Sequence, residues 1–120
     1  MSSARETTVL AYLAAMAAGD LDAVVACFTA EGKVSSPVYG GVPVGDFYRR
    51  LFTDTASAHV EIRNIFSAEH QLAAHFAYRW VLKTGAKTAT DLVDIFDFTP
   101  GNDKISHLQI IFDTAKIGKG

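Results

Sequence analysis

The sequence predicts an α+β domain in which N-terminal helices pack on an antiparallel sheet. Apolar residues recur every three or four positions through the first half of the chain, as they do on one face of a helix. The second half is instead rich in Val, Ile, Phe and Tyr, in segments separated by short turns. Helices followed by a run of strands are typical of α+β domains and not of parallel α/β domains.

The first helix is expected to begin and end at clear signals. Ser3 and Glu6 have the spacing of a capping box, in which each side chain pairs with a free backbone amide at the start of a helix. Gly19 is suited to end this helix, and Asp20 to cap the next one. The apolar face of the first helix is predicted to comprise Val9, Leu10, Tyr12, Leu13, Met16 and Ala17.

Two more helices are expected before the strands begin. Apolar spacing predicts the second helix from Leu21 to Phe28, followed by a turn over 29–32 and a short extended segment over 33–36. Pro43 suits the first turn of a third helix, which reaches Leu51. The strands are then expected in antiparallel hairpin order, near residues 58–67, 71–83, 88–99 and 104–114.

Composition limits the classes of function. The 120 residues fit one domain, 1–120, with 49% hydrophobic and 20% charged residues. A net charge of −2 without a basic run argues against nucleic acid or an anionic membrane surface as partner. Cys27 is the only cysteine, which excludes an internal disulfide. Neither a secretory signal nor a membrane span is recognisable, so a cytoplasmic location is expected.

Asp94 is the most informative residue for chemistry. In the strand 91–98, alternation puts its carboxyl on one face with large apolar neighbours. If that face meets the helices, loss of hydration raises the pKa of Asp94, and the neutral acid can donate a hydrogen bond to a developing oxyanion. The other interpretation is a partly exposed aspartate, or one paired with a nearby donor. The apolar neighbours on this face are Leu92, Phe96 and Phe98.

Several segments together resemble the delta-5-3-ketosteroid isomerases, in the SnoaL-like branch of the nuclear transport factor 2-like superfamily. The Gly19-Asp20 junction is common to the superfamily, whereas the positions of Tyr12, Tyr48 and Asp94 are more specific. The resemblance covers nearly the whole chain, apart from a shortened loop before the third helix. The segments that carry it are 11–13, 19–24, 34–37, 47–49 and 91–94.

The resemblance implies a curved sheet that forms a cone with an internal apolar pocket. It also implies that Tyr12 and a protonated Asp94 form an oxyanion hole, with Tyr48 supporting Tyr12 by hydrogen bonding. The implied function is enol or enolate acid–base chemistry of isomerase, cyclase or dehydratase type on a small hydrophobic carbonyl compound. The implied substrate-binding wall consists of Leu92, Phe96, Leu108, Ile110 and Phe112.

The chain departs from that family at the expected catalytic base. The aspartate that should precede Pro37 is replaced by Ser36, and a hydroxyl is too weak a base to take a proton from carbon unaided. Ser36 is therefore expected to contact the substrate. The alternative functions are a binding protein for a small hydrophobic molecule, or a dimerising interaction module. Members of the family commonly pair through the sheet, which predicts a homodimer with Val93, Ile95 and Ile111 as apolar contacts.

Two other groups are candidates for the base. Gapless matching back from Asp91 places His75 and Arg79 on the pocket face, where His75 would be a candidate base because an imidazole is the usual proton acceptor near neutral pH. Hydrophobicity favours the opposite face of this strand, which carries Phe76, Tyr78, Trp80 and Leu82, so the two interpretations conflict. The second candidate is an ionised Asp94, with Tyr12 as the acid.

No cofactor and no metal are expected. The four histidines are scattered without ligand spacing, and Gly40-Gly41 lacks the other residues of a phosphate loop. Cys27 is expected to be a small buried hydrophobe. On the last strand, His107, Gln109 and Asp113 are expected to face solvent or a partner subunit.

Overall fold

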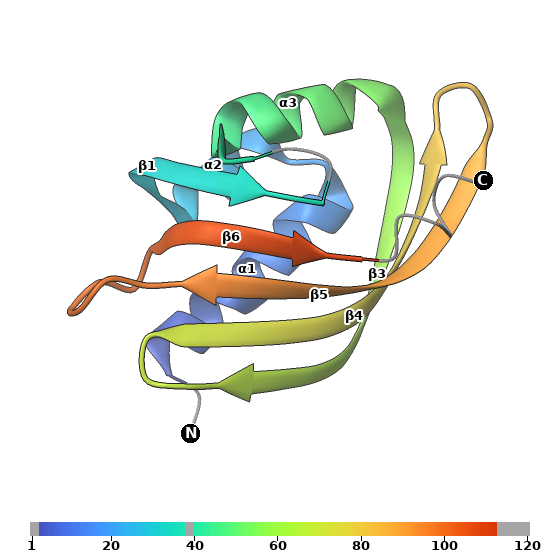
Figure 1. Cartoon of the computed structure of the whole chain (residues 1–120). Helices are drawn as coiled ribbons and strands as arrows, with labels where there is room; N and C mark the ends of the chain where they lie inside the picture. The colour runs from blue at the N-terminus through green and yellow to red at the C-terminus, as the bar shows by residue number, and fades with distance from the viewer. Residues whose placement is uncertain (1–2, 38–39, 113–120) are drawn as a thin grey trace.

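The computed structural model describes residues 3–37 and 40–112, in which three helices cover one side of a six-stranded sheet (Figure 1). The helices are α1 (Ala4–Ala18), α2 (Leu21–Ala26) and α3 (Val44–Asp54). The strands are β1 (Phe28–Ser35), β2 (Val42–Pro43), β3 (Thr55–Ser67), β4 (Gln71–Leu82), β5 (Lys87–Asp97) and β6 (Ile105–Ile111). They are ordered β2-β1-β6-β5-β4-β3.

The predicted fold class is confirmed: helices pack on a curved, unclosed sheet that is mostly antiparallel. Strands β3 to β6 are antiparallel neighbours in chain order, as the hairpin pattern predicts. Strand β1 is the exception, because it lies parallel to β6. The two strands are more than 70 residues apart in the sequence. The long strands curve under α1 and α3, so their concave face forms the floor beneath the helices (Figure 1).

The junction between α1 and α2 forms as predicted. At the start of α1, the Ser3 hydroxyl accepts a hydrogen bond from the Glu6 amide at 3.0 Å, which is one half of the predicted capping box. Gly19 ends α1 with a left-handed φ of 69°. The Asp20 carboxylate then accepts from the Ala23 amide at 3.1 Å and caps α2. One predicted core position is wrong, since Leu10 is exposed on the outer side of α1.

The segment after α2 differs from its prediction. Residues 29–32 belong to β1 instead of a turn, and α2 ends at Ala26 instead of Phe28. The pairing of β1 with β6 shifts between Phe28 and Lys33, which marks a bulge. Gly32 lies so close to Phe28 that a Cβ atom there would be 2.9 Å from the Phe28 side chain. The glycine therefore permits a bulged strand.

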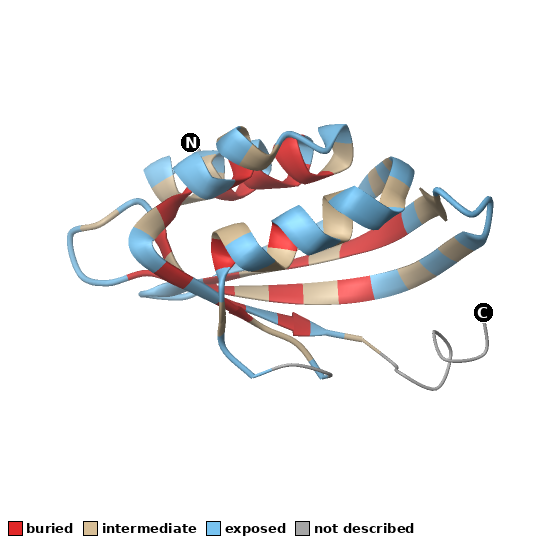
Figure 2. Ribbon diagram, turned by 90° about the horizontal axis from the view of Figure 1, so that it is seen from above, coloured by how far each residue is buried: buried red, intermediate tan, exposed pale blue. Residues whose placement is uncertain are grey.

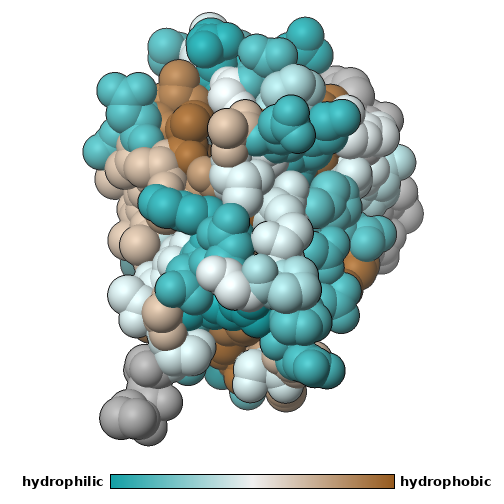
Figure 3. All heavy atoms as spheres, turned by 90° about the vertical axis from the view of Figure 1, so that its left-hand side faces the viewer, coloured by the Kyte–Doolittle hydropathy of each residue, from teal (hydrophilic) through white to brown (hydrophobic). Residues whose placement is uncertain are grey.

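Arg5 attaches the start of α1 to two turns of the sheet. Its guanidinium donates hydrogen bonds to the backbone oxygens of Asn102 at 3.1 Å, Glu69 at 2.9 Å and Thr99 at 2.9 Å. The guanidinium carbon also lies 5.1 Å from the centre of the Phe98 ring. Figure 3 views the side of the molecule at which these turns lie, and its surface is mainly hydrophilic.

The core lies between the helices and the concave face of the sheet. Buried residues occupy the sides of the helices that face the sheet and alternate along the strands (Figure 2). The concave-face positions of β4, β5 and β6 carry the buried set, in agreement with the alternation in the sequence. Asp94 belongs to this set and is 1% exposed. None of the helices within the described residues has the length and apolar character needed to cross a membrane.

Candidate functional site

An apolar cavity of about 190 Å³ lies between the helices and the concave face of the sheet. Its polar side chains come from α1, α3, β4 and β5, and from Ser36 just after β1. The remaining lining side chains are aliphatic, aromatic or thioether groups. The cavity is lined by Tyr12, Met16, Ser36, Phe47, Tyr48, Leu51, Tyr78, Trp80, Leu92, Asp94, Ile110 and Phe112.

Asp94 is the only carboxyl group that lines this cavity among the described residues. Burial raises the pKa of Asp94 well above its ordinary value, because the apolar surroundings disfavour the carboxylate. Hydrogen bonding from the Tyr12 hydroxyl lowers the same pKa and offsets the effect of burial in part. Within the described residues, Asp94 Oδ1 has no hydrogen-bond partner. The side chain is thus suited to be a neutral acid with one oxygen open to a ligand.

Tyr12 and Tyr48 form the second part of the polar cluster. Both are fully buried, and their hydroxyl groups are hydrogen-bonded to each other. Tyr12 Oη also lies 3.4 Å from Met16 Sδ, and the Tyr12 ring packs edge-on against Phe28 and Phe96. Burial, together with the neighbouring ionisable groups, raises the pKa of both hydroxyls, so both remain donors at neutral pH.

The structure brings most of the predicted site residues together, with two exceptions in the predicted wall. Tyr12, Tyr48, Asp94 and Ser36 all line the cavity, as do the wall residues at 92, 110 and 112. Phe96 and Leu108 do not line it, although they are on the predicted face of their strands. Both are fully buried, and the Phe96 ring packs against Tyr12 with centroids 5.4 Å apart. Both side chains are thus part of the core and not of the cavity lining.

His75 lies on the opposite face of the sheet. Its register partner on β5 is Val93, whereas Asp94 is paired with Ala74 on the cavity face. The interpretation from gapless matching is therefore wrong, and the one from hydrophobicity gives the observed facing. His75 is half-buried on the convex side and does not line the cavity, so its assignment as a base there is corrected.

Tyr78 and Trp80 are cavity residues that the site prediction did not include. Alternation of large apolar residues on this strand was their signal, but the competing alignment put them on the outer face. The two rings are stacked with centroids 4.6 Å apart. Burial raises the pKa of Tyr78 to about 12, and its hydroxyl has no partner among the described residues. Phe47, Leu51 and Met16 were missed because the predicted wall was drawn from strands alone.

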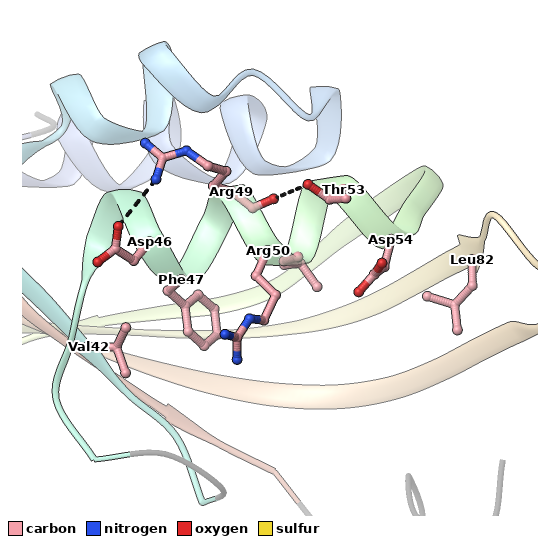
Figure 4. Close-up of a pocket in the computed structure, with 9 residues that line it drawn as sticks. Val42, Asp46, Phe47, Arg49, Arg50, Thr53, Asp54 and Leu82 are labelled. Atoms are coloured by element: carbon pink, nitrogen blue, oxygen red, sulfur yellow. Dashed lines mark hydrogen bonds and ion pairs between the residues drawn. The ribbon is translucent and has the colours of Figure 1, made fainter.

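A larger hollow of about 860 Å³ lies on the surface beside α3 (Figure 4). Figure 4 shows Arg50 extending from α3 beside Phe47, while Arg49 is directed to the other side and pairs with Asp46 at 3.2 Å. Phe47 and Leu51 line both this groove and the inner cavity, so they form the partition between the two. The buried acid and the paired phenols lie in the smaller cavity, which is therefore the candidate site.

A separate series of hydrogen-bonded polar side chains crosses the convex face of the sheet. Ser35 Oγ lies 2.9 Å from His107 Nε2, and His107 Nδ1 lies 3.2 Å from an oxygen of Asp97. The second oxygen of Asp97 accepts from the Gln71 amide at 2.7 Å. The order of groups is that of a hydrolase triad, but these residues line neither the cavity nor the groove of Figure 4. We interpret these hydrogen bonds as structural links between the neighbouring strands β1, β6, β5 and β4.

The remaining candidate residues lie outside the cavity lining. His107 and Gln109 lie away from the cavity, as predicted, whereas Asp113 lies outside the described residues. Cys27 is buried, as predicted. Across the described ranges, no three His, Cys, Asp or Glu side chains are grouped so that they could hold a metal ion together.

Comparison with known families decides the classification. The model of the SnoaL-like domain family matches residues 9–108, which is most of the chain. The chain belongs to the SnoaL-like domain family. The match spans α1 through most of β6, so it includes every cavity residue except Ile110 and Phe112. A search of curated proteins gives no match for this SnoaL-like domain.

Solved structures share the fold of this SnoaL-like domain at low sequence identity. An NTF2-like protein of unknown function from Burkholderia pseudomallei is 19% identical, with a TM-score of 0.84 over 98% of this chain and 97% of that one. A protein named as a putative SnoaL-like polyketide cyclase, from Shewanella denitrificans, is 12% identical, with a TM-score of 0.82 over 96% and 94%. SalBIII, an epoxide hydrolase/cyclase-like enzyme of pyran ring formation in salinomycin, is 19% identical, with a TM-score of 0.79 over 93% and 92%. These likenesses show the fold.

Proposed function

We propose that this SnoaL-like domain stabilises the enolate of a small hydrophobic carbonyl compound, in a reaction of isomerase, cyclase or dehydratase type. One observation carries the proposal: a buried acid and a buried phenol line the same apolar cavity. Asp94 and Tyr12 are the proposed oxyanion donors, and Tyr48 positions Tyr12 through their hydroxyl–hydroxyl hydrogen bond.

The cavity suits such donors for an electrostatic reason. A negative charge that develops on the carbonyl oxygen is stabilised most by fixed donors in surroundings of low dielectric constant. Burial keeps the pKa of Asp94 raised and its proton in place, so the carboxyl can donate without adding a second negative charge. The apolar lining would hold the hydrocarbon part of the substrate.

Removal of the carbon-bound proton needs a separate acceptor. Ser36 occupies the cavity at the place where the resemblance implies an aspartate base. Among the described lining residues there is no carboxylate besides Asp94 and no imidazole. The proposal therefore assigns enolate stabilisation to the protein and proton transfer to water or to a basic group of the substrate.

Solvent exchange of the α-protons of 2-tetralone, followed in deuterium oxide by NMR, tests this proposal. We expect the wild-type domain to accelerate exchange above the buffer rate, and Asp94→Asn to reduce the acceleration by about a hundredfold or more, as for loss of one oxyanion donor. Asp91→Asn is the matched control, because Asp91 lies on the exposed face of the same strand. Equal rates for wild type and Asp94→Asn would contradict the proposal.

Ser36 also favours a second candidate, a binding protein that retains the cavity without turnover. Binding of 2-naphthol, whose fluorescence reports its ionisation, separates the two functions. A binding protein would shift the naphthol spectrum in an Asp94-dependent way while leaving the exchange of 2-tetralone at the buffer rate. The enzyme proposal expects both the spectral shift and the accelerated exchange.

We further propose that two copies associate through the convex face of the sheet. Phe66 is 60% exposed and Ile111 is 42% exposed on this face, where a monomer would leave them in water. Register places Ile111 beside Val93, and Phe66 in one row with Ile95 across β4. These side chains supply a continuous apolar strip for a partner copy.

A further inference from the structure

The Tyr78 hydroxyl is a buried polar group to which the proposed mechanism gives no role. The residue is 4% exposed, it lines the cavity, and its oxygen has no hydrogen-bond partner among the described residues. Stacking against Trp80 at 4.6 Å fixes the direction of the ring. Buried hydroxyls are normally paired, so an unpaired one beside a cavity indicates a partner that the ligand supplies.

A second unpaired atom faces the same cavity at a different place. Asp94 Oδ1 is also buried without a partner among the described residues. Tyr78 pairs in register with Thr90 on β5, four residues from Asp94, so their backbone positions are about 13 Å apart along the strand. The two side chains converge on one cavity from these separate positions. Among the described residues, the largely apolar cavity therefore has two buried polar atoms without a hydrogen-bond partner, one at each of these positions.

Tyr78 is also within electrostatic reach of the oxyanion donors. Tyr12, Tyr48 and Tyr78 line the same cavity, and the Tyr78 side chain contributes to the raised pKa of both other hydroxyls. The phenol remains protonated at neutral pH and is thus a hydrogen-bond donor toward the cavity.

We propose that Tyr78 is a second recognition group, and that the natural ligand carries two oxygen functions. One is the carbonyl oxygen that Tyr12 and Asp94 bind, and the other is a carbonyl, ether or hydroxyl oxygen that accepts a hydrogen bond from Tyr78. This inference rests on the proposed function, because it takes the first oxygen to lie at Asp94. It narrows the substrate class from small hydrophobic carbonyl compounds to those with a second oxygen acceptor.

Matched naphthols test the inference through binding alone. The affinities of 2-naphthol, 2,6-dihydroxynaphthalene and 2,7-dihydroxynaphthalene are measured by fluorescence titration with the wild type and with Tyr78→Phe, which keeps the ring. We expect at least one dihydroxy isomer to bind the wild type about five- to thirtyfold more tightly than 2-naphthol, the effect of one hydrogen bond. Tyr78→Phe should remove this advantage and change the affinity for 2-naphthol less than about twofold.

The remaining outcomes separate the two proposals. If 2-naphthol binds in an Asp94-dependent way but no dihydroxy isomer gains affinity through Tyr78, the second recognition group is refuted and the oxyanion site stands. If 2-naphthol binding is absent or indifferent to Asp94→Asn, the proposed function fails and this inference fails with it. A lower melting temperature of Tyr78→Phe without any ligand effect would assign the hydroxyl to a buried water and overturn the inference.

Discussion

Asp94 shows how one buried carboxyl group can make the stability of the fold depend on pH. Its carboxyl is enclosed by apolar side chains, and burial holds the pKa well above the ordinary value of 3.8. The unfolded chain releases this proton above about pH 4, whereas the folded domain retains it to a higher pH. The apolar environment that keeps the carboxyl neutral therefore lowers the stability of the folded state as the pH rises.

This difference predicts a pH dependence of stability. The free energy of unfolding of the wild type should fall as the pH rises from about 4 toward the pKa of folded Asp94, because over that range the unfolded state binds fewer protons. Asp94→Asn removes this loss, so the variant should gain stability relative to wild type with rising pH. Urea denaturation from pH 4 to 8 measures the difference, with Asp91→Asn as control. A constant difference would refute a raised pKa.

Single residues also show how far the sequence could predict the site. Alternation puts the Asp94 carboxyl on one face with large apolar neighbours, but it left a partly exposed aspartate as the other interpretation, and only the family resemblance implied a site role. The facing of His75 was not determined, because a one-residue shift in strand register exchanges the two faces. The unpaired state of the Tyr78 hydroxyl depends on every neighbour in space, and no local pattern encodes it.

At the scale of elements, the helix junction was predictable and β1 was not. Ser3, Gly19 and Asp20 act on backbone groups within a few residues, so their roles can be inferred from local sequence. Residues 29–32 include a glycine and a charged residue that suggest a turn, yet they form a bulged strand. Pairing with β6, more than 70 residues away, outweighs the local preference.

The attachment of α1 to the sheet makes Arg5 a test of element packing. Arg5→Lys keeps the charge but cannot reach three backbone oxygens in different directions, because an ammonium group lacks the planar fork of guanidinium. We expect the free energy of unfolding to fall by about 1–2 kcal/mol, measured by urea denaturation.

Arg50→Lys is the control for this substitution. Arg50 is exposed on α3, and no ion pair or hydrogen bond from it is found within the described residues, so its replacement should change stability by less than about 0.5 kcal/mol. Equal effects of the two substitutions would show that the contacts of Arg5 contribute little.

For the whole molecule, the order of helices and strands was enough to predict the α+β class and the antiparallel hairpins. The parallel pairing of β1 with β6 was not predicted, because the two strands are more than 70 residues apart and no local pattern links them. The curved sheet and its cavity were expected from the family resemblance, because curvature arises from how all the strands pack together.

The apolar strip on the convex face predicts the state of association. Sedimentation velocity at tens of micromolar should show a dimer for the wild type and a monomer for Ile111→Lys, because a buried, unpaired ammonium would oppose the interface. Leu10→Lys is the matched control, since Leu10 is equally exposed, at 39% against 42% for Ile111, but lies on α1. A monomeric wild type would remove the proposal of a homodimer.

Phe47 and Leu51, which separate the cavity from the outer groove, bear on the size of ligand that the cavity can hold. The cavity volume of about 190 Å³ is below the range of about 300–1,000 Å³ that is usual for sites of drug-sized ligands. A ligand that extends toward α3 would have to displace Phe47 or Leu51, and these side chains also border the outer groove. Binding of such a ligand would join the cavity and the groove into one hollow. The resistance of α3 to this displacement would then limit the size of the ligand on that side.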